Sequence, residues 1–102
     1  MHNTTYRTLP GLNATNLRMV SGGDVGLTDS SDLIANLMIS YDPDVIILGG
    51  DIAYDDGMRT CYHSWDNFYD IFENIHRKIN RIIPMVLTVG NHDVGFDALG
   101  KV

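Results

Sequence analysis

The amino-acid sequence predicts an α/β fold, a β-α-β-α-β unit built on a parallel sheet. Three short apolar runs are each followed by glycine and then by polar residues, which is the pattern of strands that end in tight turns. Two stretches between these runs carry apolar residues at the three- and four-residue spacing of helices, and no internal repeat is present. Because right-handed crossovers connect parallel strands, the carboxyl ends of all three strands should lie at one edge of the sheet.

The first predicted strand covers residues 17–20, and we expect it to be buried and to end in a glycine-rich turn before Asp24. A helix should follow over residues 31–41, because residues 30–32 offer N-cap side chains and Pro43 prevents its continuation. The apolar stripe expected on this helix consists of Leu33, Ile34, Leu37, Met38 and Tyr41.

The second predicted strand, residues 45–48, is a continuous β-branched and Leu run, typical of a parallel strand buried on both faces. A polar loop over residues 51–60 should lead to a longer helix that Pro84 closes, and a third strand is expected over residues 85–89. The apolar stripe of the longer helix, assigned to the core, consists of Trp65, Phe68, Tyr69, Phe72, Ile75, Ile79 and Ile82.

Composition limits the classes of function. A chain of 102 residues with 44% hydrophobic residues is one small domain or a piece of a larger one. A net charge of -6 with only 7 Lys and Arg argues against a nucleic-acid surface. The single Cys61 cannot form an intrachain disulfide, and the first ten residues contain neither a secretory signal nor a membrane span. Asn3 and Asn13 begin sequons that would accept glycans in the secretory pathway.

Polar side chains are expected to gather at the carboxyl edge of the sheet, where open α/β sheets bind ligands. Carboxylate, phenol and amide oxygens together with an imidazole suit metal ions. Taken alone, each aspartate is more simply a turn residue and the tyrosine a half-buried aromatic, but their joint position favours a metal site. The residues are Asp24, Asp51, Tyr54, Asn91, His92 and Asp93, the last interpreted as a turn residue or a support behind the ligands.

Three motifs in this order resemble those of the calcineurin-like metallophosphoesterases, over residues 17–97. They are Gly23-Asp24-Val25-Gly26, Gly50-Asp51-Ile52-Ala53-Tyr54 and Gly90-Asn91-His92-Asp93. The resemblance implies that residues 17–102 are the first part of a four-layer α/β/β/α sandwich, a partial catalytic domain. Residues 1–16 would then be a linker or the end of a preceding β-sandwich domain.

Most of that superfamily has Asp-x-His in the first motif, whereas this chain has Gly26 in place of the histidine and Tyr54 three residues after Asp51. This exchange resembles the purple acid phosphatase branch. The resemblance implies that Asp24 and Tyr54 bind ferric iron and that Asp51 bridges to a second metal, which is zinc, manganese or ferrous iron. Asn91 would bind that second metal, and His92 would be catalytic, holding the phosphoryl oxygens or protonating the leaving group.

The resemblance further implies a metal-dependent acid phosphatase that hydrolyses small phosphate monoesters and is secreted or lysosomal or vacuolar. We expect no nucleic-acid or membrane partner, and the sequence does not indicate an oligomeric state. His2, His63 and His76 are interpreted as surface or packing residues, and Asp55, Asp56 and Asp70 as solvated positions.

Three alternatives stay open. The family completes its site with later histidine motifs, and no histidine follows Asp93, so a fragment, a truncated gene model or a degenerate homologue is expected. The chain could therefore be a non-catalytic remnant that binds only a metal or a partner. It could also be a phosphodiesterase or nucleotidase of the same superfamily, or a receiver-like domain, although Gly-Asn-His-Asp is foreign to receivers.

Overall fold

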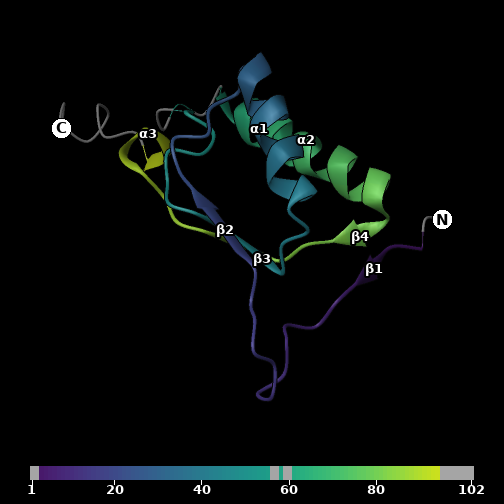
Figure 1. The fold of residues 1–102 in the computed structure, drawn as a ribbon. Coiled ribbons are helices and arrows are strands. Elements are labelled where there is room, and N and C mark those ends of the chain that lie inside the picture. Colours follow the sequence, from purple (N-terminus) through teal and green to yellow (C-terminus); the bar gives the residue numbers. More distant parts are fainter. Residues whose placement is uncertain (1–2, 56–57, 59–60, 95–102) are drawn as a thin grey trace.

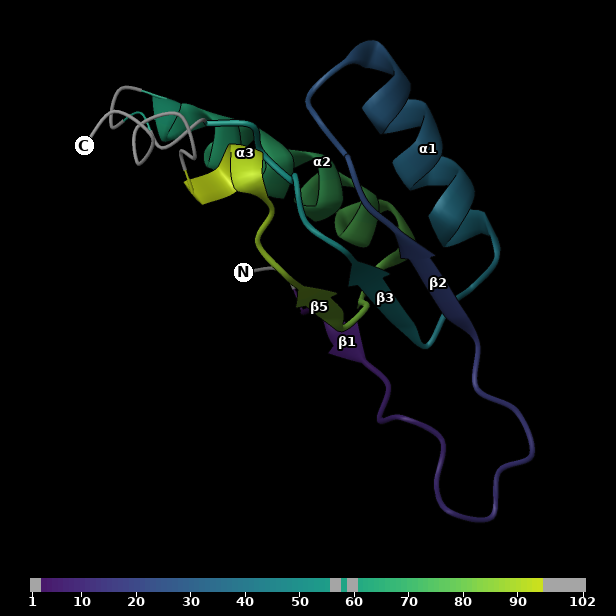
Figure 2. The ribbon, with the colours of Figure 1, turned by 90° about the vertical axis from the view of Figure 1, so that its left-hand side faces the viewer.

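A computed structural model describes residues 3–55, 58 and 61–94, and its centre is a three-stranded parallel sheet (Figure 1). The strands are β2 (Met19–Gly22), β3 (Val45–Leu48) and β5 (Met85–Leu87), in the order β2-β3-β5. Figure 2 shows them side by side with their arrows pointing the same way. The predicted α/β class with a parallel sheet is confirmed.

The helices follow the predicted alternation with the strands. They are α1 (Asp29–Ser40), α2 (His63–Ile79) and a short α3 (Asn91–Val94). Helices α1 and α2 pack on the same face of the sheet, where Ile46 and Leu48 of β3 are 0% and 1% exposed (Figures 1 and 2). This one-sided cover follows from right-handed crossovers when each new strand joins the same side of its predecessor. Helix α3 instead lies beyond the end of β5.

The strand boundaries confirm one prediction fully and correct two. Strand β3 has the predicted bounds, Val45–Leu48. Strand β2 begins at Met19 instead of residue 17 and continues to Gly22, because its register aligns Met19 with Val45. Strand β5 ends at Leu87, two residues before the predicted end.

The expected burial of the first strand is wrong, because β2 has one neighbour in the sheet and the helices cover only one of its faces. Met19 is 59% exposed and Val86 of β5 is 51% exposed. The register places Ser21, Ile47 and Val86 in one row across the face that the helices leave open. Of the three strands, only β3 is largely buried.

Helix α1 presents a different face to the core from the one its larger apolar residues predicted. Ser31, Ala35 and Ile39 are buried at successive four-residue steps. The small side chains of Ser31 and Ala35 let α1 approach α2 closely. The Ser31 hydroxyl, 3.0 Å from the Val25 carbonyl oxygen, is satisfied by donating to it. The apolar residues left 57–72% exposed are Leu33, Ile34, Leu37 and Tyr41.

The long helix is shorter than its predicted stripe. It ends at Ile79 because Asn80 adopts a left-handed conformation with φ 52°. The next two residues form strand β4 (Arg81–Ile82), which pairs in parallel with β1 (Thr5–Tyr6). The packed stripe is Phe68, Phe72 and Ile75, whereas Tyr69, Ile79 and Ile82 are 54%, 39% and 48% exposed.

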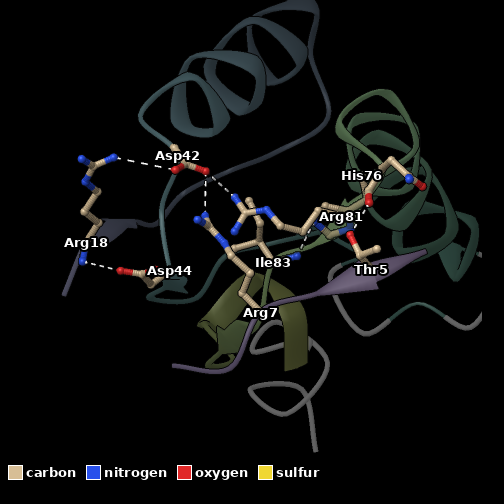
Figure 3. A network of polar contacts seen from close by, with 9 residues as sticks. Thr5, Arg7, Arg18, Asp42, Asp44, His76, Arg81 and Ile83 are labelled. Atoms are coloured by element: carbon tan, nitrogen blue, oxygen red, sulfur yellow. Dashed lines mark hydrogen bonds and ion pairs between the residues drawn. The ribbon is translucent and has the colours of Figure 1, made fainter. Parts of the chain in front are cut away.

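An ion cluster at the amino ends of the strands connects the first residues of the chain to this body (Figure 3). The Asp42 carboxylate accepts hydrogen bonds from Arg7 and Arg81, both at 2.7 Å, and Arg18 lies at 3.8 Å. The Thr5 hydroxyl donates to the carbonyl of Asn80 at 2.6 Å. Whether residues 1–16 belong to another domain stays a prediction.

None of the helices in the described ranges has the length and apolar character that crossing a membrane requires.

Candidate metal centre

The loops that follow β2 and β3 are joined by their backbones at the carboxyl edge of the sheet. The amide of Asp24 donates to the carbonyl of Gly50 at 3.0 Å, and the amide of Val25 donates to the carbonyl of Asp51 at 2.9 Å. Two predicted ligands, distant in sequence, therefore lie on adjacent loops. Both aspartates have φ of 50°, a left-handed conformation that costs a residue other than glycine about 1–3 kcal/mol.

Glycine is required where the loop after β5 meets the loop after β3. A Cβ atom on Gly90 would overlap both the side chain and the backbone nitrogen of Asp51. Gly50 has φ of 97°, and a Cβ atom there would lie 2.9 Å from the nitrogen of Gly90. The close approach of these two loops lets the amide of His92 donate to Asp51 Oδ1 at 2.9 Å.

Tyr54 connects the second motif with the first. Its hydroxyl donates to Asp24 Oδ1 at 2.9 Å. That hydrogen bond, with smaller contributions from desolvation and from the negative charges of Asp24, Asp51 and Asp93, raises the pKa of Tyr54 to about 12. Without a cation nearby, the phenol therefore keeps its proton at neutral pH.

The third motif places His92 against Tyr54. Their rings stack with centroids 4.8 Å apart and an interplanar angle of 25°. Asn91 is the first residue of α3, and both Asn91 and His92 are exposed to solvent. Direct contacts thus connect Asp24, Asp51, Tyr54 and His92, and Asn91 adjoins them in the chain.

Asp93 has a larger part in this edge than the sequence indicated. Its side chain is 9% exposed and accepts hydrogen bonds from the backbone amides of Ile52, Ala53 and Gly90 at 2.9–3.0 Å. Burial raises the pKa of Asp93, but hydrogen bonds from Gly90, Ile52, Ala53 and Tyr54 outweigh it, and the pKa falls below its usual value. Because Ile52 and Ala53 are buried, an unpaired amide at either one would cost about 1–3 kcal/mol.

The position of Asp93 after Gly-Asn-His was the only sequence signal for this role, and it does not reveal long-range backbone contacts. Other predicted positions can also be placed. The interpretation of Asp55 as simply solvated is wrong, because Trp65 Nε1 donates to its carboxylate at 3.0 Å. His76 is a packing residue, as expected: its Nε2 accepts the amide of Ile83 at 3.4 Å. His2, Asp56 and the segment 95–102 lie outside the described residues.

The side chains at this edge fit part of a metal centre. Two carboxylates and one phenol supply the hard oxygen donors that ferric and divalent cations prefer. An open hollow of about 640 Å³ adjoins Asp24 and Tyr54 and extends to the start of α1. Within the described ranges, no three His, Cys, Asp or Glu side chains form a group that could hold a metal ion by themselves. Any cation here would therefore also need Tyr54, Asn91 or donors beyond those ranges.

Comparison with protein families matches the chain to the model of the calcineurin-like phosphoesterases over residues 2–101. Comparison with curated proteins gives no significant match. The family match agrees with the geometry, in which the carboxylates and the imidazole of three motifs meet at the carboxyl edge of a parallel sheet. Members of this family are metal-dependent phosphoester hydrolases that generally use two metal ions. This chain belongs to the calcineurin-like phosphoesterase family.

Proposed function

We propose that this protein hydrolyses phosphate monoesters with a ferric ion and a divalent ion, as the purple acid phosphatases do. The observation that carries the proposal is the position of the Tyr54 ring. Gly26, where most of the superfamily has histidine, leaves open space next to this ring: a Cβ atom there would lie 4.0 Å from Tyr54 Cε2. Tyr54 therefore occupies the neighbourhood that a histidine would fill, with its hydroxyl at Asp24.

The proposed ligands have distinct roles. Asp24 and Tyr54 would hold ferric iron, which favours anionic oxygen donors. Asp51 would bridge the two ions, and Asn91 would hold the divalent one, which is zinc, manganese or ferrous iron. The bound pair would supply positive charge for the transferring phosphoryl group and would acidify the attacking water.

The remaining residues at this edge would orient the substrate. The exposed His92 ring lies against Tyr54, where an imidazole N–H can donate to a phosphoryl oxygen or give a proton to the leaving oxygen. The backbone amide of His92 already donates to Asp51, which fixes the carboxylate relative to the backbone of His92. The substrate would be a small phosphate ester. The proposed location is secreted, lysosomal or vacuolar, where the exposed sequons at Asn3 and Asn13 would accept glycans.

The experiment has two measurements on protein loaded with iron plus zinc or manganese. First, hydrolysis of an aryl phosphate at acidic pH should be lost with Asp51→Asn and kept with Asp70→Asn, a change of the same charge at an exposed position of α2. Second, the protein should be violet, because a phenolate bound to ferric iron absorbs visible light.

Tyr54→Phe should remove the violet colour and leave the fold intact. An unchanged visible spectrum in iron-loaded Tyr54→Phe would exclude the ferric assignment and would indicate a zinc or manganese enzyme of the same family. Equal activity of Asp51→Asn and Asp70→Asn would exclude this edge as the site of hydrolysis.

A further inference from the structure

The Asp93 carboxylate connects the second and third motifs through backbone hydrogen bonds. Oδ1 accepts the amides of Ile52 at 2.9 Å and Ala53 at 3.0 Å, and Oδ2 accepts the amides of Ile52 and Gly90, both at 3.0 Å. A longer contact of 3.4 Å reaches the amide of Tyr54. One buried side chain therefore satisfies successive donors of the loop after β3 together with the Gly90 donor of the loop after β5.

These bonds are not those of an ordinary turn. A turn or cap aspartate accepts amides within a few residues of itself, as Asp93 does with Gly90 three positions earlier. Ile52 and Ala53 are 41 and 40 positions away. The carboxylate is thus a long-range anchor for the backbone between Asp51 and Tyr54.

The anchored segment needs outside support. Asp51 and Tyr54, at its two ends, have φ of 50° and 54°, in the left-handed region that residues other than glycine seldom adopt. Between them, Ile52 and Ala53 are 0% and 2% exposed, so water does not reach their amides freely. Without the Asp93 oxygens, the loop would lose the hydrogen bonds that offset its strained ends.

We propose that Asp93 is a positioning residue that fixes Asp51 and Tyr54 in their ligand-presenting conformation before any metal binds. This inference rests on the proposed metal site. It adds which residue holds the ligands in place before the metal binds. Metal-ion sites depend on such supporting groups, whose removal typically weakens affinity by about 10–100-fold. Asp93 would act through the loop backbone and would not touch the metals or the substrate.

The first test uses the unmodified protein without metal. If Asp93 holds the loop, the amide protons of Ile52 and Ala53 should exchange with solvent slowly, because they are bonded to a buried carboxylate. Hydrogen exchange followed residue by residue by NMR measures this directly. Exchange of both amides at the rate of an unstructured peptide would overturn the proposal.

The second test compares Asp93→Asn with Asp70→Asn. An asparagine amide group has only one carbonyl oxygen, so at least one of the loop amides loses its acceptor. We expect Asp93→Asn to bind Mn²⁺ or Zn²⁺ about 10–100-fold more weakly, as titration calorimetry would show, and Asp70→Asn to bind as the unmodified protein does. A folded Asp93→Asn with unchanged affinity would overturn the proposal.

General destabilisation needs its own control. Ile75→Ala removes part of a buried side chain of α2, away from the loops, and leaves a cavity in the core. This variant should be less stable. At a temperature where it is still folded, it should bind metal as the unmodified protein does. Metal affinity reduced equally in Ile75→Ala and Asp93→Asn would overturn a specific role. If Asp93→Asn does not fold, the hydrogen-exchange measurement on the unmodified protein decides whether Asp93 holds the loop.

The proposed function can fail separately. A protein that binds metal but does not hydrolyse phosphate esters would disprove the activity, and the affinity comparison would still decide the role of Asp93.

Discussion

The carboxylates at the two ends of the sheet differ in whether positively charged side chains lie against them. At the amino ends of the strands, the charge of Asp42 is matched by Arg7 and Arg81 at 2.7 Å, with Arg18 at 3.8 Å (Figure 3). At the carboxyl ends, Asp24 and Asp51 accept from a phenol and from a backbone amide, and no Lys or Arg of the described segments forms an ion pair with them. One end is neutralised by the protein itself, and the other keeps negative charge available for a cation.

The largest expected difference between the two ends is in catalysis. Asp51→Asn should reduce metal-dependent hydrolysis by more than about 100-fold, the upper effect of groups that only support a ligand. Asp42→Asn, the same chemical change at the other end, should leave turnover within about twofold, because its partners are arginines remote from the loops. Steady-state kinetics with metal analysis checks both, and similar losses in the two variants would remove the functional distinction between the ends.

A smaller effect is expected for Asn91→Ala, which should chiefly loosen the divalent ion. An amide oxygen is a neutral ligand, so its loss should weaken the binding of the divalent ion by about 10-fold or somewhat more and leave ferric iron in place. The zinc-to-iron ratio after dialysis measures this. Equal loss of both metals would contradict separate ligand sets.

At the opposite end the expected effect is on stability. Asp42→Ala should lower the free energy of unfolding by about 1 kcal/mol, because ion pairs this exposed are weakened by solvent. The loss should be smaller at high salt, since ions screen such pairs. Urea unfolding at low and high salt tests this, with Asp70→Ala as an exposed control. A loss independent of salt would show that Asp42 acts through its left-handed turn, with φ of 50°.

The smallest expected change is in the titration of one phenol. The pKa of Tyr54 is raised from 10.0 to about 12, and Asp24→Asn should lower it by removing the charged acceptor. The unfolded chain ionises first, so any stability from the protonated phenol is complete below pH 10 and is lost as the pH rises toward 12. Ultraviolet difference titration of metal-free protein against Tyr54→Phe isolates this group. An identical titration in Asp24→Asn would refute the hydrogen bond.

The sequence predicted those elements that have a periodic apolar pattern or clear turn residues at their ends. Strand β3 was found at its observed bounds because a β-branched run stands between Asp-Pro-Asp and Gly-Gly-Asp. Strands β1 and β4 have two residues each, too few to show alternation, and were missed. The exposed face of α1 was misjudged because Ala35 and Ser31 carry little hydrophobic signal, yet their small size decides which face packs.

The sequence predicted the part of the candidate site that side-chain types define. It did not predict the part that depends on backbone hydrogen bonds. The order of motifs brought Asp24, Asp51, Tyr54 and His92 to one edge, and the structure connects them by contacts. The roles of Asp24, Asp51 and Tyr54 as metal ligands and of His92 as a catalytic residue stay predictions. The long-range hydrogen bonds of Asp93 come from the backbone amides of Ile52 and Ala53. Because nearly every residue type has such an amide, no sequence motif could reveal these bonds.

The pairing of β1 with β4 has a consequence for how the chain folds. Thr5 and Asn80, joined by a hydrogen bond beside this pair, are 75 positions apart, whereas each helix forms from neighbouring residues. Closing so long a loop costs entropy, and among the described residues the contacts that offset it include two short strands and the arginines around Asp42. The first residues should therefore dock last and detach first, with the helices and the three-stranded sheet already assembled beneath them.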